Sequence, residues 1–161
     1  MVADYVQASA NCQTAGRAIA HMFNELRKIG FRASNFECSG HSLGAHVCSY
    51  AAKYTMSEFG FKISRMTGMD PAGPLFEKTD IEVRFDRTDA EFVDVIHANA
   101  GNENDGFMGI HTAVGHADFF PNGGHHVGYK EGPKQIIDHG APSSDAVNGI
   151  ILLHFRPDLL F

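Results

Sequence analysis

The segment Gly40-His41-Ser42-Leu43-Gly44 constrains this chain more than any other feature of the sequence. It stands between a short strand-like run, residues 35–38, and an apolar helix-like run that begins at Leu43. G-x-S-x-G between a strand and a helix is the pattern of a nucleophile elbow, in which the serine backbone is strained. The pattern predicts Ser42 Oγ at the carboxyl end of the strand, with the Leu43 N–H directed at a developing oxyanion. A glycine-rich turn with an idle serine is the alternative interpretation of the bare pattern.

Helix-like and strand-like segments alternate along the first two thirds of the chain. Apolar residues recur at helical spacing over residues 12–26, and the elbow helix is expected over residues 43–54. Strands are expected over residues 61–69 and, most strongly, over the β-branched run 92–98. This order predicts an α/β fold in one domain, with a largely parallel sheet.

Composition excludes several classes of function. The chain has 161 residues and a formal charge of −6, from 13 Lys and Arg against 19 Asp and Glu. This acidic balance argues against a nucleic-acid partner, because such binding depends on neutralising phosphates with basic side chains. No apolar run approaches the ~20 residues of a transmembrane segment, and the first residues lack the features of a signal peptide. Three cysteines cannot all pair within one chain, so no disulfide framework is predicted.

A serine nucleophile needs a base and an acid that orients the base. Asp70 is the candidate acid because it ends the strand that follows the elbow helix, and Pro71 keeps the next residues out of helical geometry. An ordinary turn aspartate is the alternative. The candidate bases are the late histidines, and order and spacing do not choose among them: His125, His126, His139 and His154.

Several ordered motifs resemble the pancreatic-type (animal) lipase family: DYVQASANCQTAGRAIA, SGHSLGAH, ISRMTGMDPAGPLFE, FVDVIHANAG and VGHADFFPNGG. The resemblance implies an α/β-hydrolase fold, with Ser42 as nucleophile, Asp70 as triad acid and Leu43 as one backbone oxyanion donor. The base of that family lies in an H-x-R segment that opens a helix. His154-Phe155-Arg156 matches this segment, whereas His139 has no arginine two residues later, so His154 is the preferred base.

The resemblance also implies a function. The expected activity is that of a secreted serine esterase that hydrolyses lipid carboxylic esters, most simply a triacylglycerol lipase that releases fatty acids. A phospholipase A1 and a non-catalytic lipid-binding or yolk-type protein of the same fold are the alternatives. The substrate is expected at a lipid interface, with a colipase-like or lipoprotein partner. Residues 129–152 occupy the place of the family's lid, and their length favours the triacylglycerol lipases.

Compared with that family, this chain resembles an internal piece of a catalytic domain. The whole of residues 1–161 is expected to form one partial α/β-hydrolase domain without its N-terminal strands and without the loop that supplies the second oxyanion donor. Two consequences are expected: an open sheet edge at residues 35–38, and no activity of this fragment alone. The natural protein is expected to be extracellular.

The resemblance also implies one metal site. In this family a calcium ion is bound at the place of RFDRTDA, which assigns as ligands the carboxylates of Asp86 and Asp89 and the backbone carbonyls of Ile81 and Arg84. The chemistry itself requires no cofactor, so this calcium would be structural. A solvated acidic turn is the alternative. Zinc is not favoured at His125-His126 or at His111 and His116, because neither pair has a carboxylate partner on a helix.

Overall fold

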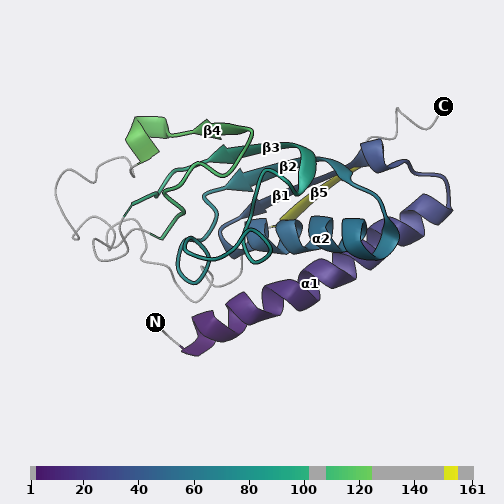
Figure 1. Ribbon diagram of the computed structural model, residues 1–161, viewed down its shortest axis with the longest axis horizontal. Coiled ribbons are helices and arrows are strands. Elements are labelled where there is room, and N and C mark those ends of the chain that lie inside the picture. Colours follow the sequence, from purple (N-terminus) through teal and green to yellow (C-terminus); the bar gives the residue numbers. More distant parts are fainter. Residues whose placement is uncertain (1–2, 102–107, 125–150, 156–161) are drawn as a thin grey trace.

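The computed structural model describes residues 3–101, 108–124 and 151–155 (Figure 1). These residues form a five-stranded sheet in the order β4-β3-β2-β1-β5. The strands are β1 (Phe36–His41), β2 (Ile63–Met69), β3 (Ala90–Ile96), β4 (Ala117–Phe119) and β5 (Ile151–Phe155). Neighbouring strands from β1 to β4 are parallel, and β5 is antiparallel to β1. The predicted α/β fold with a mostly parallel sheet is confirmed.

Two long helices, α1 (Ala3–Lys28) and α2 (Leu43–Phe59), lie on one side of the sheet (Figure 1). Helix α1 starts earlier than the apolar spacing over residues 12–26 predicts, because no helix breaker precedes Cys12 and Tyr5 and Ala8 pack beside the buried Cys12. The two helices approach closely at Gly16, where a Cβ would lie 2.5 Å from that of Tyr50. Short 3-10 helices, η1 (Ala33–Asn35) and η3 (Pro121–Gly124), complete the described elements.

The core lies between α2 and the sheet. Strand β1 buries every second residue, as expected for a strand with one face against helices, and β2 buries Ile63, Met66 and Gly68. Strand β3 adds a run of three buried residues, residues 93–95. Eight of its large side chains are fully buried: Phe23, Phe36, Ile63, Met66, Phe85, Val93, Val95 and Ile110. This packing fixes the strand ends from which the candidate site is built.

A disulfide joins Cys38 in β1 to Cys48 in α2. The prediction of no disulfide framework was therefore wrong. An odd number of cysteines excludes complete pairing, but it still allows one bridge. Here β1 and the helix that follows it bring two of the three cysteines together. Cys12 is the remaining free cysteine; it is buried, and burial raises the pKa of its thiol to about 11. The bridge encloses Ser42 within a loop with a sequence separation of 10.

The sheet edge beside β1 is covered, contrary to the expected open edge at residues 35–38. Strand β5 pairs with β1 along residues Phe36 to Gly40, through Phe155 to Ile151. The backbone groups of β1 on that side thus have a partner within the chain, which removes the hazard of an unpaired edge strand. Apart from its last two residues, which lie in β5, the lid-like segment 129–152 falls outside the described residues.

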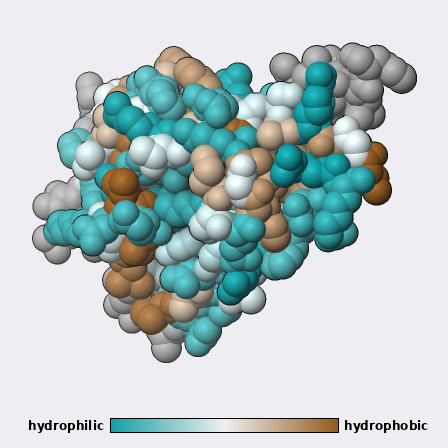
Figure 2. All heavy atoms as spheres, turned by 45° about the vertical axis from the view of Figure 1, so that its right-hand side comes forward, coloured by the Kyte–Doolittle hydropathy of each residue, from teal (hydrophilic) through white to brown (hydrophobic). Residues whose placement is uncertain are grey.

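The surface in Figure 2 carries its hydrophobic side chains in small, separate groups among hydrophilic ones. Exposed apolar residues include Leu75, Ile81 and Met108, which lie on the segments that follow β2 and β3 in the chain. Neither α1 nor α2 is apolar enough to be a candidate membrane span.

Candidate active site

The elbow has the strained geometry that its sequence predicts. Ser42 lies between β1 and α2 with φ 53° and ψ −123°, a backbone conformation that residues with a Cβ rarely adopt. Gly40 is required there, because a Cβ on this residue would overlap the carbonyl group of Gly44. The Ser42 N–H donates to the Met69 carbonyl oxygen at 3.0 Å, and the Ser42 carbonyl oxygen accepts from Ala72 N–H at 3.3 Å. Strand β2 and the chain beyond it therefore hold the strained turn in place.

Leu43 is the first residue of α2, and its side chain is buried. The first N–H groups of an α-helix have no partner within the helix, and they carry the positive end of its dipole. The N–H of Leu43 belongs to this first turn and follows Ser42 directly in the chain, which is compatible with the oxyanion-donor role that the sequence predicts for it.

Asp70 follows β2 as Ser42 follows β1. His41 and Met69 are paired across the two parallel strands, so the residues that follow them lie side by side at one edge of the sheet. Asp70 also has a positive φ, 48°, and its N–H donates to the carbonyl oxygen of Ile96 in β3 at 2.7 Å. The structure therefore brings the predicted nucleophile and the predicted acid together.

The Asp70 carboxylate is oriented by the chain that follows β3. Its Oδ1 accepts hydrogen bonds from the backbone N–H of Ala98, at 3.1 Å, and of Asn99, at 2.8 Å. Gly109 packs so closely on this oxygen that a Cβ there would overlap it. Among the described residues, no donor bonds the other carboxylate oxygen, Oδ2. The sequence interpretation did not predict that residues 98–99 and 109 contact the Asp70 carboxylate. Of these residues, only Gly109 offered a signal in the sequence, because a glycine can mark a close approach.

His154 does not lie beside Ser42. It is in β5, where its backbone pairs with Glu37 near the start of β1, whereas Ser42 follows the other end of that strand. At about 3.3 Å per residue, the two positions on β1 are roughly 16 Å apart. His154 also lies in a strand and does not open a helix, as the resemblance implied. His125, His126 and His139 lie outside the described residues.

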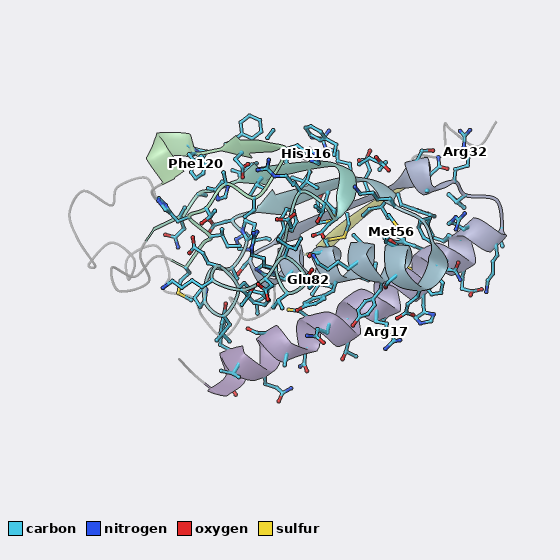
Figure 3. The ribbon with its side chains drawn as sticks, viewed as in Figure 1. Arg17, Arg32, Met56, Glu82, His116 and Phe120 are labelled. Atoms are coloured by element: carbon cyan, nitrogen blue, oxygen red, sulfur yellow. A yellow bond between two sulfur atoms is a disulfide. The ribbon has the colours of Figure 1, made fainter. Side chains whose placement is uncertain are left out.

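The buried histidines near the site have other partners. His97 is fully buried, with Nδ1 2.8 Å from the Ile110 carbonyl oxygen and Nε2 2.8 Å from Asp118 Oδ1. Its ring also stacks on that of Phe120, which is labelled in Figure 3. His97, which directly follows β3, thus connects the end of that strand to Ile110 and to Asp118 in β4. Within the described part of the chain, no buried histidine has a ring nitrogen placed to take the proton of Ser42.

His46, in the first turns of α2, is a buried neutral histidine. Its Nδ1 accepts the N–H of Phe85 at 3.2 Å, and its Nε2 donates to the Ala72 carbonyl oxygen at 2.8 Å. Burial is the main reason why the pKa of His46 falls to about 3, since the ring is fully buried and a charged form would lose its water. His46 thus acts as a neutral hydrogen-bonding group that connects two points of the chain after the predicted acid, Ala72 and Phe85.

The four predicted calcium ligands lie along one loop, residues 81–89, beside α2. Glu82, within this loop, is labelled near α2 in Figure 3. Asp86 and Asp89 are buried, and Ile81 is exposed. Lys53 and Ser49 of α2 reach this loop and bond Arg84 and Asp89. Among the described residues, no cluster of three or more His, Cys, Asp or Glu side chains could hold a metal ion.

Lys53 and Ser49 were missed by the sequence interpretation. The signal was present, because His46, Ser49 and Lys53 recur at spacings of three and four residues within an otherwise apolar helix. Burial lowers the pKa of Lys53, and the nearby Asp89 carboxylate opposes this effect. Burial likewise raises the pKa of Asp89, against the hydrogen bonds that it accepts from Lys53 and Ser49.

Comparison with known proteins gives three findings. A family model described as Lipase matches residues 1–144. The pancreatic triacylglycerol lipase of Mus musculus is 46% identical over 123 residues, and that of Homo sapiens is 45% identical; each match covers 74% of this chain and 25% of the relative. The inactive pancreatic lipase-related protein 1 of Mus musculus is 43% identical over 139 residues, 83% of this chain and 28% of that protein. The chain spans about a quarter of the length of these curated relatives.

Proposed function

Since this chain belongs to the lipase family, we propose that it carries the nucleophile and the acid of a serine esterase that hydrolyses lipid carboxylic esters. Triacylglycerols are the proposed substrate, because relatives that cover 74% of this chain carry the name triacylglycerol lipase. The relative named as inactive matches a larger share of the chain, so similarity alone does not decide between activity and its loss. Catalysis is therefore inferred from the geometry of the site.

The backbone of Ser42 is the observation that supports this proposal most strongly. A serine with φ 53° and ψ −123° is costly in free energy, by about 1–3 kcal/mol for such a residue. The cost serves a purpose at a nucleophile, because the strained turn presents Oγ beside the helix N-terminus. An idle turn would require neither this geometry nor the glycine at position 40.

The proposed chemistry is acyl transfer in two steps. Ser42 Oγ attacks the ester carbonyl carbon while the base takes its proton, and the Leu43 N–H donates to the oxyanion. The protonated base then gives its proton to the leaving alcohol oxygen, which leaves an acyl-enzyme. Water, activated by the same base, hydrolyses the acyl-enzyme and releases the fatty acid. Asp70 would hold the base in the correct tautomer through its Oδ2, while Oδ1 remains bonded to Ala98 and Asn99.

His154 is the proposed base, for the resemblance of residues 154–156 to the family's H-x-R segment. This role requires residues 151–155 to leave their pairing with β1 in the active protein, since His154 now stands opposite Glu37. His139 is the alternative. The variants His154→Ala and His139→Ala distinguish them, because loss of the base abolishes turnover and loss of the other histidine leaves it nearly unchanged.

The test is ester hydrolysis by the natural full-length protein. Wild type is expected to hydrolyse emulsified triacylglycerols, and Ser42→Ala is expected to lower kcat by several orders of magnitude while lipid binding remains. Ser57→Ala, which changes an exposed serine on α2, is the matched control and is expected to retain full activity. Turnover by Ser42→Ala at the wild-type rate would contradict the proposal.

The same assay decides between the alternatives. Faster release of fatty acid from phospholipid vesicles than from triacylglycerol would identify a phospholipase A1. Binding to both without turnover would identify a non-catalytic lipid-binding or yolk-type protein.

We also propose that the natural protein is secreted and acts at a lipid interface, with a colipase-like or lipoprotein partner. The Cys38–Cys48 bridge supports the location, since disulfides persist mainly in oxidising compartments. The partner is a prediction from the resemblance, and co-purification of the full-length protein with lipid emulsions tests it.

A further inference from the structure

A lysine of α2 bonds two of the oxygen atoms that the resemblance assigns to calcium. Lys53 Nζ lies 2.6 Å from Asp89 Oδ1 and 2.9 Å from the Arg84 carbonyl oxygen. It also lies 2.7 Å from Ser49 Oγ, one turn earlier on α2. The Lys53 side chain is 21% exposed and that of Asp89 is 2% exposed, so the contact between the ammonium group and the carboxylate is largely shielded from solvent.

The other carboxylate oxygens assigned to calcium, on Asp86 and Asp89, have donors as well. Asp89 Oδ2 accepts from Ser49 Oγ at 2.7 Å and from the Asp86 N–H at 3.0 Å. Asp86 Oδ1 accepts from the N–H and the hydroxyl of Thr88, and its Oδ2 lies 3.2 Å from the Arg84 guanidinium. The predicted ligand groups at Arg84, Asp86 and Asp89 are thus satisfied by protein donors.

A calcium ion does not fit this arrangement. Ca²⁺ is bound by 6–8 oxygen atoms at about 2.3–2.6 Å, so an ion shared by Arg84 and Asp89 would stand where the Lys53 ammonium group is. Two positive charges cannot share one position between two oxygens. Calcium binding would require Lys53 to leave, which would break its ion pair with Asp89 and its hydrogen bonds to Ser49, Arg84 and Asp89.

We propose that Lys53 supplies the positive charge at residues 84–89 in place of a calcium ion, so that this loop is held in its folded form without metal. Lys53 is in this view an internal cation, covalently attached to α2. This inference does not depend on the proposed esterase activity, because it concerns only the loop and α2.

The position of the loop explains why it needs a cation. Three residues on one side of α2 bond it: His46 accepts from Phe85, and Ser49 and Lys53 bond Arg84 and Asp89. Arg84 faces Asp86, whereas Lys53 is the ion-pair partner of the buried Asp89 carboxylate among the described residues, and a buried carboxylate without such a partner is costly. The loop also carries the buried Phe85 ring, which packs against Gly68 in β2, two residues before Asp70. Lys53 thereby supports the strand that ends at the predicted acid.

The test is calcium titration of the natural full-length protein, by calorimetry and by thermal unfolding in EGTA and in millimolar calcium. For wild type we expect no heat of binding and no rise in Tm. Calcium binding at micromolar concentration with a rise in Tm would overturn the proposal. This test uses the wild-type protein, so it does not depend on whether any variant folds.

Lys53→Met removes the charge and keeps most of the length of the side chain. We expect its Tm in EGTA to fall, and calcium to raise that Tm again, because the freed oxygens can then accept an ion with an affinity at least about tenfold above that of wild type. Lys78→Met, at an exposed lysine, is the matched control and should show neither effect.

The double variant Lys53→Met with Asp89→Asn locates any new binding. Loss of the gained calcium effect in this variant supports the proposal, since the ion then needs the carboxylate that Lys53 had neutralised. Lys53→Met without any change in Tm in EGTA would contradict it. A gained calcium effect that persists without the Asp89 charge would also contradict it, because the ion would then be bound elsewhere.

Discussion

Ser42 and Asp70 occupy equivalent positions on neighbouring strands: each is the first residue beyond its strand, and each has a positive φ, 53° and 48°. The residues before them, His41 and Met69, are paired in register. The candidate nucleophile and acid therefore lie together because of the backbone, before any side chain contributes. A parallel sheet provides this arrangement, since the carboxyl ends of its strands meet at one edge.

The first prediction concerns the glycine before the elbow. Gly40→Ala is expected to destabilise the protein by about 3 kcal/mol or more, because its Cβ overlaps the backbone of Gly44 and the disulfide-linked helix cannot move away. Gly60→Ala is the comparison, since that glycine has φ 70° but no atom within 4 Å of the place that a methyl group would take. Its expected cost is only about 1 kcal/mol of conformational strain. Urea unfolding measures both, and equal losses would contradict the overlap.

The second prediction concerns the predicted acid. Asp70→Asn keeps an oxygen that accepts from Ala98 and Asn99 but removes the charge. Its expected effect on ester hydrolysis is a fall in kcat of about 10⁴-fold, the size found when a triad acid is changed to its amide, with little change in Tm. Asp80→Asn, at an exposed aspartate, is the control. A fall in kcat below tenfold for Asp70→Asn would remove Asp70 from the mechanism.

The third prediction concerns the bridge across the elbow. Replacing both Cys38 and Cys48 by alanine is expected to lower the free energy of unfolding by about 2–3 kcal/mol, the loop-closure contribution of a crosslink with a sequence separation of 10. Denaturant unfolding measures this loss. Thiol counting on the 161-residue chain in unfolding buffer should detect one reactive thiol, that of Cys12, and three after reduction. Three thiols before reduction would show that the bridge does not form.

The fourth prediction concerns acid stability. The pKa of His46 is about 3 in the folded protein and about 6.5 when the chain is unfolded, so unfolding takes up a proton between these values. The stabilisation by neutral His46 is therefore fully present above pH 6.5 and is lost as the pH falls toward 3, by about 1.4 kcal/mol per pH unit. The unfolding free energy of wild type and of His46→Gln, measured between these pH values, should differ in slope by this amount. Parallel slopes would show that His46 is protonated in the folded protein.

Local patterns predicted much of this molecule. The elbow helix, the strand that ends at Asp70 and the strand over residues 92–98 depend on residues close in sequence, and the structure contains all three within a few residues of the expected bounds. The family resemblance is confirmed by the match to residues 1–144. The elbow geometry was predictable because G-x-S-x-G specifies a backbone conformation and not only a composition.

Features that depend on distant pairing were not predictable. Strand β5 joins β1 across more than a hundred residues, and no local pattern specified an antiparallel partner there. The same pairing separates His154 from Ser42, which the H-x-R pattern had no means to indicate. The Cys38–Cys48 bridge and the Lys53–Asp89 contact likewise depend on how α2 packs against the sheet and the loop at residues 84–89.

Covalent labelling of Ser42 tests the central claim most directly. An organophosphonate reacts only with a serine whose base and oxyanion donors are assembled, so the full-length protein should be labelled on the peptide that contains Ser42. The 161-residue chain alone should be labelled much more slowly, because part of the oxyanion hole is expected outside it and His154 lies far from Ser42. Mass spectrometry of the digested proteins measures both rates. Absence of label on Ser42 in the full-length protein, or its appearance on another serine, would contradict the assignment of Ser42 as the nucleophile.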